Sequence, residues 1–375
     1  MAVLKPFRAL RYDPEAAGPL DRLVAPPHDV VGAELSERLV AAEPHNVIRL
    51  TRPEDPAEAG RLFREWQDEG VLVRETEPAV WILEEIFAGP EGAPRTRRSL
   101  VARLRVTPYG EGDVFPHERT FAGQKEARLE LLRAVRAKLS PVLLMHAGGS
   151  PAEPEGEPDL EATLDGVTSR LWRVTDADAI EQAVAVVRGP LVIADGHHRY
   201  ETALRYHQED GTEESAYVLA ALTARADPGL VILPTHRLAD APLPQLNGRF
   251  RVTPLEGAAG ALDRLGGVTR DHPAFVLLRR EGAELVEAEP ESGAAGALDT
   301  AALATLPLTG VRFTPSAEEA ERTVEAGGAE AAFLVRAPTV EQVEAVALAA
   351  ETMPEKSTYF FPKLTTGLLF APYDE

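Results

Sequence analysis

The sequence predicts an α/β (α+β) protein with more than one lobe. Segments typical of strands alternate with segments typical of helices along most of the chain. A chain of 375 residues is longer than one hydrophobic core usually needs, and 44% hydrophobic with 26% charged residues is ordinary globular composition. We expect a core with inserted segments over residues 1–240, a small α/β subdomain over 241–350, and a C-terminal β segment over 351–375 that returns to the core.

The first half of the chain mixes short extended pieces with longer regular elements. The Pro26-Pro27 pair excludes helix locally, because proline lacks the backbone donor and restricts the residue before it. The patterns that follow predict a helix over 33–43, a strand over 46–51, an amphipathic helix over 56–69, a strand pair over 79–88 and 95–109, and a helix over 124–140.

The second half opens with an exposed loop rich in glycine, proline and glutamate over 148–161. The later patterns predict a strand over 168–175, a helix over 176–189, a strand over 190–195, a helix from near Arg199, and an extended run over 230–238. Strand and helix then alternate between about 245 and 350, and the C-terminal stretch 357–373 is extended and β-rich.

Composition excludes several classes of function. Without cysteine the chain has no disulfide, thiolate metal site or cysteine nucleophile. No apolar run reaches the roughly 18 residues of a membrane span, and the N-terminus lacks the apolar region of a signal peptide. A net charge of −21 counts against DNA binding through phosphate neutralisation. We therefore expect a cytoplasmic protein with no membrane partner.

The segment PLVIADGHHRYETAL, residues 190–204, carries the densest chemistry in the chain. A strand that ends at Asp195-Gly196 and leads into a helix builds an anion site, because the first N–H groups of a helix lack internal partners. Arg199 adds a forked cationic donor, and His197 and His198 exchange protons near neutral pH. Asp195 is placed to hold Mg²⁺ or to activate a hydroxyl group.

The sequence resembles known families at this turn and in several other segments. The Asp-Gly-His-His-Arg-Tyr turn resembles the phosphate-binding turn of the ParB/sulfiredoxin-like fold, to which free serine kinases also belong. Over nearly its full length the chain is similar to the DUF1015 family, through FRALRYDP, LVAPPHDVV, NVIRL, FPHERTFAGQKEARLELLRA, SPVL, LWRVTD, IADGHHRYETAL, DPGLVILPTHR and MPEKSTYFFPKLTTGLLF.

The resemblance implies a ParB/sulfiredoxin-like nucleotide-binding core in which Gly196, His198 and Arg199 cradle a nucleotide phosphate. His197 stands where sulfiredoxin has its reactive cysteine, so peroxiredoxin repair by that route is excluded. It also stands where ParB has a glutamate, and the basic helix-turn-helix region of a DNA-partitioning ParB is not evident in the sequence.

A second charged loop, FPHERTFAGQKEARL, precedes the helix over 124–140. Glu118 is a candidate general base, and the loop also supplies candidate phosphate-binding residues, namely His117, Arg119 and Lys125. The alternative is a solvated loop. Arg128, Arg133 and Arg136 are assigned to the exposed face of the following helix. Further candidates of lower rank are His28, Asp29, His236, Arg237, Lys356, Ser357 and Lys363.

Three functions remain open from the sequence. The first is a nucleotide-binding enzyme that uses ADP or ATP with Mg²⁺, held at Asp195, to phosphorylate a small hydroxyl-bearing metabolite, as a serine kinase does. The second is a ParB-like nucleotide-dependent switch that binds DNA or a protein partner. The third is a metal-dependent nucleotide or phosphate hydrolase.

Overall fold

The protein is mixed α/β, as the sequence predicts. The computed structural model describes residues 2–28, 30–120, 122–240, 246, 248–256 and 260–374, and these residues form a large mixed sheet and twelve α-helices. The chain divides into two compact units. Unit 1 comprises Met1–Phe115, Thr120–Val231 and Pro362–Glu375, and unit 2 comprises Pro116–Arg119 and Ile232–Phe361.

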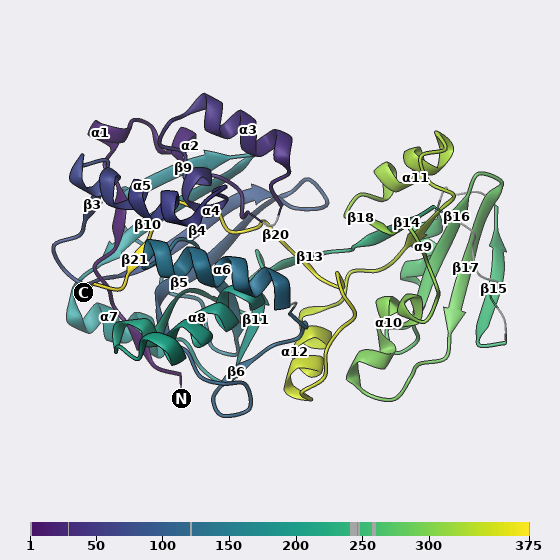
Figure 1. The fold of residues 1–375 in the computed structure, drawn as a ribbon. Coiled ribbons are helices and arrows are strands. Elements are labelled where there is room, and N and C mark those ends of the chain that lie inside the picture. Colours follow the sequence, from purple (N-terminus) through teal and green to yellow (C-terminus); the bar gives the residue numbers. More distant parts are fainter. Residues whose placement is uncertain are drawn as a thin grey trace. The chain divides into compact units, whose positions relative to one another are not determined.

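Unit 1 is built on a nine-stranded sheet within the described residues, in the order β6-β11-β8-β12-β5-β4-β10-β9, with β1 also paired to β5 (Figure 1). Its strands are β1 (Leu4–Lys5), β4 (Val80–Ala88), β5 (Pro94–Arg105), β6 (Val114–Phe115), β8 (Val142–His146), β9 (Leu160–Leu164), β10 (Val167–Val174), β11 (Leu191–Asp195) and β12 (Tyr217–Ala224).

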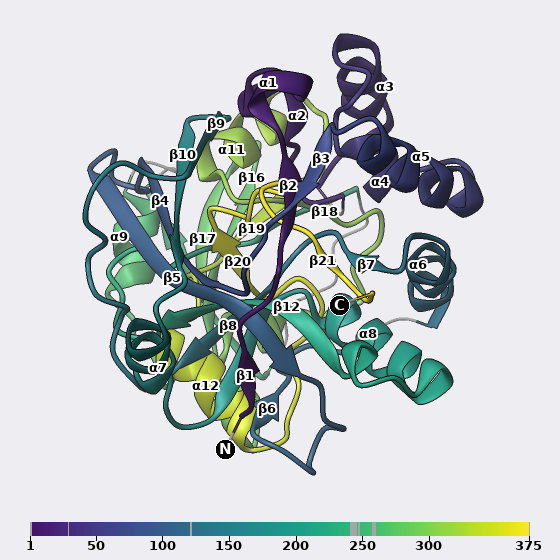
Figure 2. The ribbon, with the colours of Figure 1, turned by 90° about the vertical axis from the view of Figure 1, so that its left-hand side faces the viewer.

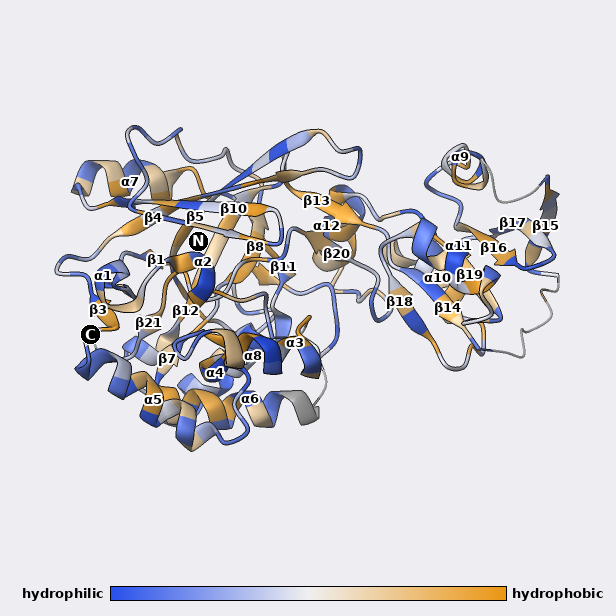
Figure 3. Ribbon diagram, turned by 90° about the horizontal axis from the view of Figure 1, so that it is seen from above, coloured by the Kyte–Doolittle hydropathy of each residue, from blue (hydrophilic) through white to orange (hydrophobic). Residues whose placement is uncertain are grey.

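The pairing in this sheet is mixed. β6 runs parallel to β11 and β8 runs parallel to β12, whereas the other pairs are antiparallel, including the predicted pair β4 and β5. The central strands β8 and β11 are coloured mainly hydrophobic (Figure 3), and β12 is buried throughout. Near-continuous apolar runs are expected of strands that are covered on both faces.

Alternation along the strands gives the sheet two different faces. Side chains such as Ile82, Leu100 and Leu222 form an apolar core with Tyr200 and Ala203. The opposite face carries buried polar side chains, among them Glu85, Arg97, Ser99, Arg103 and Thr223.

The C-terminal segment is bound to the polar face. Arg97 donates a 2.7 Å hydrogen bond from Nη2 to the carbonyl oxygen of Pro362, and Arg103 donates to that of Pro372. The polar residues of the sheet therefore satisfy backbone groups of residues far away in the sequence.

The helices of unit 1 are α1 (Pro14–Ala17), α2 (Leu20–Leu23), α3 (Ala33–Ala42), α4 (Ile48–Thr51), α5 (Pro56–Asp68), α6 (Ala122–Val135), α7 (Ala177–Ala185) and α8 (His197–Asp210). Helix α6 lies beside α5 and α8, as Figure 2 shows from the side of unit 1. Two small ribbons complete the unit, β2 (Leu10–Tyr12) with β3 (Leu72–Arg74), and β7 (Ala137–Lys138) with β21 (Ala371–Pro372). A short 3₁₀ turn, Glu214–Ala216, leads from α8 into β12.

Unit 2 contains an antiparallel six-stranded sheet in the order β15-β17-β16-β19-β14-β18. Its strands are β14 (His236–Ala239), β15 (Phe250–Leu255), β16 (Ala274–Arg279), β17 (Gly282–Ala288), β18 (Arg312–Thr314) and β19 (Ala331–Leu334). Its helices are α9 (Ala261–Gly266), α10 (Asp299–Ala304), α11 (Ala317–Glu325) and α12 (Val340–Leu348), with a 3₁₀ turn at Ala294–Ala297. β13 (Val231–Leu233) pairs with β20 (Tyr359–Phe361).

The units divide between residues 231 and 232 and between 361 and 362, whereas the sequence places these boundaries after 240 and 350. β14 pairs with β18 and β19, so residues 236–239 belong to the smaller sheet. None of the helices in the described part of the chain is long and apolar enough to cross a membrane.

Two predicted elements differ from the structure. The predicted strand over 46–51 is wrong, because these residues form the start and body of α4. The Asn46 side chain donates to the carbonyl oxygens of Arg22 and Val24 and accepts from the N–H of Ile48, which fixes a helical start. The helix predicted over 124–140 ends at Val135, because Arg136 adopts a left-handed conformation with φ of 54°.

Candidate functional site

The turn between β11 and α8 brings the strand end, a glycine and a helix N-terminus together. Gly196 has a φ of 96°, in the left-handed region that glycine adopts at little cost. As the N-cap residue, Gly196 has no side chain that could cap α8. The first N–H groups of a helix have no partner inside the helix, and the helix dipole makes this end positive. The turn therefore presents an electropositive backbone surface.

The helix begins earlier than predicted. It starts at His197 rather than near Arg199, so both histidines lie in its first turn. His197 is buried and His198 is partly buried. Both histidines therefore belong to the turn whose backbone N–H groups have no partner inside the helix.

Asp195 joins two cations at the end of β11. Its Oδ2 accepts a 2.5 Å hydrogen bond from Nη2 of Arg199, and its Oδ1 accepts one from the ammonium group of Lys363. The three side chains are only 12–14% exposed. Burial acts to raise the pKa of Asp195, but Lys363 and Arg199 outweigh it and hold the pKa well below its usual range.

Arg199 is held at several points. Besides Asp195, it donates from Nη1 to the carbonyl oxygen of Pro141. A Cβ atom at Gly196 would lie 2.9 Å from Nε of Arg199, so the glycine also leaves room for the guanidinium group. The turn and its arginine are therefore positioned as one assembly within unit 1.

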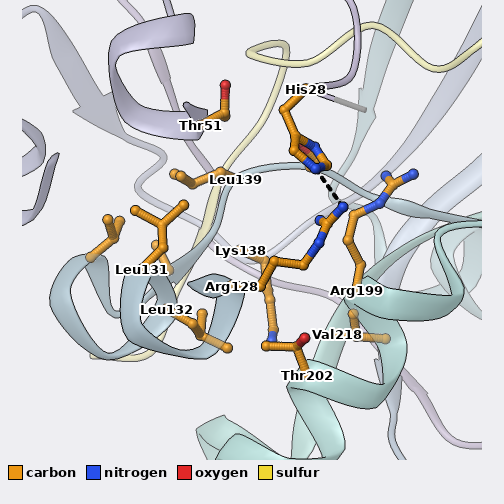
Figure 4. Close-up of a pocket in the computed structure, with 13 residues that line it drawn as sticks. His28, Thr51, Arg128, Leu131, Leu132, Lys138, Leu139, Arg199, Thr202 and Val218 are labelled. Atoms are coloured by element: carbon orange, nitrogen blue, oxygen red, sulfur yellow. Dashed lines mark hydrogen bonds between the residues drawn. The ribbon is translucent and has the colours of Figure 1, made fainter. Parts of the chain in front are cut away.

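A pocket lies beside this assembly, between α6, α8 and the segment around β7 (Figure 4). It has about 590 Å³ of empty space, including the part open to solvent. Its lining combines an apolar wall with cationic and hydroxyl groups: His28, Thr51, Arg128, Leu131, Leu132, Val135, Ala137, Lys138, Leu139, Ser140, Arg199, Thr202 and Val218. None of these described lining residues carries a carboxylate, which makes the pocket electropositive in a protein of net charge −21.

The two ends of the pocket differ. Figure 4 shows the guanidinium groups of Arg128 and Arg199 on the same side as His28, and an Nη2 nitrogen of Arg128 contacts Nε2 of His28. The side chains of Lys138 and Thr202 lie at the other end. Lys138 is 7% exposed, and burial together with the nearby charge of Arg103 lowers its pKa well below the usual lysine value.

Thr202 is a second polar group at that end. Its side chain is 4% exposed, and among the described residues its hydroxyl has no hydrogen-bond partner. A buried hydroxyl without a partner is costly, and such groups are usually satisfied by water or a ligand. The Thr202 hydroxyl could therefore form a hydrogen bond with a ligand in the pocket.

Of the other predicted site residues, Lys125 is engaged inside unit 1. Lys125 forms an ion pair with Glu201 of α8, and Thr120 donates a 2.6 Å hydrogen bond to the same carboxylate. Lys125 thus joins α6 to α8, and it is not a residue of the pocket lining. Asp29 lies outside the described residues.

The remaining predicted residues belong to unit 2. Nε2 of His117 lies 3.1 Å from the hydroxyl of Thr358, and Nε of Arg119 donates to the hydroxyl of Thr352. Glu118 lies between them in the same short segment. The structure therefore does not bring these three residues together with Asp195 inside one unit.

The pairs at 236–237 and 356–357 are also in unit 2. Nδ1 of His236 accepts a 3.1 Å hydrogen bond from the N–H of Val335, and burial lowers the pKa of His236 to about 4. Arg237 donates to the carbonyl oxygens of Thr235 and Glu355, and Ser357 to that of Pro354. Lys356 is exposed.

No group of three or more histidine, cysteine or acidic side chains in the described chain is arranged to hold a metal ion. At Asp195 both carboxylate oxygens already accept from cations. A metal ion at this position would need to displace Arg199 or Lys363, or to enter together with the phosphates that it accompanies.

Sequence reasoning missed part of the pocket. The sequence places Arg128 on the exposed face of its helix, but it is partly buried and lines the pocket, whereas Arg133 and Arg136 are exposed as expected. Lys138 and Thr202 were not singled out. The scarcity of lysine, five against 34 arginines, is the one sequence signal that pointed to Lys138.

Three solved structures illustrate what the fold is similar to. A free serine kinase in complex with AMP is 16% identical over 66% of this chain and 83% of its own, with a TM-score of 0.39. A conserved hypothetical protein from Pyrococcus furiosus is 16% identical over 68% and 92%, with a TM-score of 0.36. SbnI from Staphylococcus aureus, C-terminally truncated, is 10% identical over 73% and 87%, with a TM-score of 0.39.

All three TM-scores lie below 0.5, so function is argued below from the site alone. No curated protein matches the sequence. A family model described as "Protein of unknown function (DUF1015)" matches residues 4–301, which is most of the chain. The chain belongs to the DUF1015 family.

Proposed function

We propose that unit 1 binds a nucleotide, ADP or ATP, at the start of α8 and in the adjoining pocket, and transfers its terminal phosphoryl group to a small hydroxyl-bearing metabolite. The observation that carries this proposal is the pocket lining. Its ionisable residues, His28, Arg128, Lys138 and Arg199, are all of the basic type, and no described carboxylate lines it. Such a lining favours a multiply charged anion over a neutral or cationic ligand.

In this proposal, backbone groups and side chains bind different parts of the nucleotide. The N-terminus of α8 would bind one phosphate through its backbone N–H groups and its positive helix dipole, as in other helix-terminal phosphate sites. Arg199 offers a guanidinium group that Asp195 and Pro141 hold in a fixed orientation. The leucines at 131, 132 and 139 provide an apolar wall for the base or sugar. We therefore assign Asp195 to positioning Arg199.

Phosphoryl transfer itself needs mainly positioning and charge stabilisation. The acceptor oxygen bonds to the terminal phosphorus, the bond from this phosphorus to its bridging oxygen breaks, and the acceptor loses its proton. We propose that His197 or His198 takes this proton, because both lie in the first turn of α8. Mg²⁺, if it accompanies the nucleotide, would supply neutralisation of the phosphate charge, and Asp195 is the residue of the turn that would hold it in place of Arg199 or Lys363.

The remaining parts of the proposal rest on the sequence. The strand, glycine and helix order of β11, Gly196 and α8 agrees with a ParB/sulfiredoxin-like core. The absence of cysteine agrees with a cytoplasmic enzyme. The acidic net charge favours a small-molecule acceptor over DNA.

The test is thermal unfolding of the full chain with ADP, ATP, CTP or GTP, each with and without Mg²⁺. A ligand at 100 times its Kd adds about 2.7 kcal/mol of stability, enough for a rise of several degrees in Tm. We expect ADP or ATP to raise Tm, and Arg128→Ala and Arg199→Lys to reduce the rise. Arg205→Ala is the matched control, since Arg205 lies on α8 but pairs with the exposed Glu126.

A turnover assay follows the binding test. Millimolar nucleotide that leaves Tm unchanged would overturn the proposal. Nucleotide-dependent phosphorylation of a hydroxyl compound in an acceptor screen would support the kinase activity. Phosphate release without any acceptor would instead indicate the hydrolase, and nucleotide-dependent, salt-sensitive DNA binding without turnover would indicate the switch.

A further inference from the structure

Lys138 differs from the other lysines of the protein in its surroundings. The chain has five lysines. Lys125 and Lys363 are paired with carboxylates, and Lys356 is exposed. Lys5 lies 5.0 Å from the ring of Tyr217. Among all five, only Lys138 lines the pocket.

The environment of Lys138 favours a neutral amine. Among the described residues no carboxylate pairs with Lys138 to stabilise its charged form. Burial, and secondarily the charge of Arg103, lowers its pKa. A lysine is nucleophilic only as the free amine, and desolvation beside another cation is an established way to obtain one. Its backbone is fixed by pairing of β7 with β21.

The positions of the groups in the pocket indicate what kind of ligand it fits. The amine and the unpartnered hydroxyl of Thr202 lie at one end, and the guanidinium groups of Arg128 and Arg199 lie toward the other (Figure 4). Apolar side chains, among them Leu131 and Leu132, line another side of the pocket (Figure 4). A ligand that fits this arrangement carries a phosphate at one end and a group that reacts with amines at the other.

We propose that Lys138 forms a Schiff base with a phosphorylated aldehyde or ketone whose phosphate binds Arg128 and Arg199. This inference rests on the proposed function in one respect, that the pocket binds phosphorylated ligands. The amine nitrogen attacks the carbonyl carbon, the carbonyl oxygen takes up a proton, and the nitrogen loses one, which gives a carbinolamine. Loss of water from the carbinolamine then gives the imine, with no change of oxidation state.

Thr202 is placed to serve this reaction as a positioning residue. Its hydroxyl both donates and accepts hydrogen bonds, so it can hold the oxygen of the carbinolamine before water leaves. Binding of this oxygen would also satisfy a buried group that has no partner among the described residues.

The experiment uses pyridoxal 5′-phosphate as the probe, followed by borohydride reduction and peptide mapping by mass spectrometry. We expect one adduct per chain, on Lys138, at probe concentrations and at pH near 7 where the other four lysines are not labelled. Pyridoxal, which lacks the phosphate, should label Lys138 at least tenfold more slowly. Arg128→Ala should remove most of this difference, and Thr202→Val should slow imine formation with either probe.

The wild-type peptide map identifies the reactive lysine without any substitution, so the test does not depend on the folding of a variant. Lys138→Arg should abolish the adduct, and Lys356→Arg is the matched control that should leave it unchanged. Labelling spread over Lys5, Lys356 and Lys138 in similar amounts would overturn the inference.

The two proposals fail in different ways. Nucleotide binding without labelling of Lys138 would refute the Schiff base alone. The pocket is not a phosphate site if Lys138 is labelled equally fast by pyridoxal and by its phosphate. In that case neither inorganic phosphate nor any nucleotide would slow the labelling of Lys138.

Discussion

At the scale of single residues, the arrangement of the candidate site depends on the hydrogen bonds of the Asp195 carboxylate. The sequence suggests Asp195 as a general base or metal ligand, but the structure shows it accepting from Arg199 and Lys363. A carboxylate whose pKa is held far below its usual range is a poor proton acceptor near neutral pH. Its evident role is to fix the arginine that faces the pocket.

Asp195→Asn tests this role. The substitution leaves two buried cations without their counter-charge, so we expect a loss of about 3–5 kcal/mol in the free energy of unfolding. Urea unfolding at pH 7 measures the loss. Glu318→Gln, which removes an exposed ion pair with Arg322, is the control and should cost under about 0.5 kcal/mol.

The ion pairs of Asp195 with Arg199 and Lys363 predict that the free energy of unfolding depends on pH. The pKa of Asp195 is lower in the folded than in the unfolded chain, so the stabilisation is complete above the unfolded value of about 3.9 and is lost as pH falls below it. The free energy of unfolding should therefore fall more steeply below about pH 5 in the wild type than in Asp195→Asn. Parallel pH profiles would contradict this assignment.

At the scale of elements, the site is the junction of β11 and α8, completed by α6. Gly196 permits the left-handed turn, and α8 begins directly after it at His197. α6 contributes Arg128 and the leucines of the pocket wall. The ion pair of Lys125 with Glu201 holds α6 against α8, so a residue that was expected to bind phosphate instead supports the pocket wall.

Gly196→Ala and Gly211→Ala form a matched pair, because these glycines flank the two ends of α8 and both have positive φ. Each substitution should cost about 1–2 kcal/mol for the left-handed backbone. A Cβ at Gly211 meets nothing within 4 Å, whereas a Cβ at Gly196 meets the Arg199 guanidinium group. We expect only Gly196→Ala to weaken nucleotide binding in calorimetric titration; equal weakening by both would contradict the proposed place of Arg199.

At the scale of the whole molecule, the residues of the candidate site belong to unit 1 and not to unit 2. The turn, the pocket and Lys363 belong to unit 1, although the longer segment of unit 2, Ile232–Phe361, separates Lys363 from Asp195 in the sequence. Unit 2 has its own sheet and its own apolar clusters, and its histidine and arginine on β14 are buried in hydrogen bonds to its backbone.

Hydrogen exchange measured by mass spectrometry should show this division. Saturating nucleotide should slow exchange of backbone amides in α6, in β7 and in the first turns of α8, because these segments line the pocket. Amides of β16 and β17 in unit 2 should exchange at unchanged rates. Protection confined to unit 2 would show that the ligand binds elsewhere.

Local patterns predicted much of the secondary structure, and the errors have identifiable causes. The strand pair β4 and β5 is confirmed, because its alternation is long and its turn is polar. The strand predicted over 46–51 is wrong, because a short apolar run has no distinct period and Asn46 fixes its helical start through contacts with Arg22 and Val24. Arg128 is partly buried because it contacts His28, one hundred positions earlier in the chain, and no pattern in the helix itself shows that contact.

The sequence by itself determined the strand–glycine–helix turn at Asp195-Gly196, because that geometry follows from neighbouring residues and from the left-handed φ that glycine permits. It also determined what the protein lacks, since a chain without cysteine has no thiol chemistry. Only the tertiary structure decided that Lys363 joins Asp195, that Arg128 faces a pocket, and that Lys138 is buried in it. These facts depend on contacts between distant segments, and no local pattern records them.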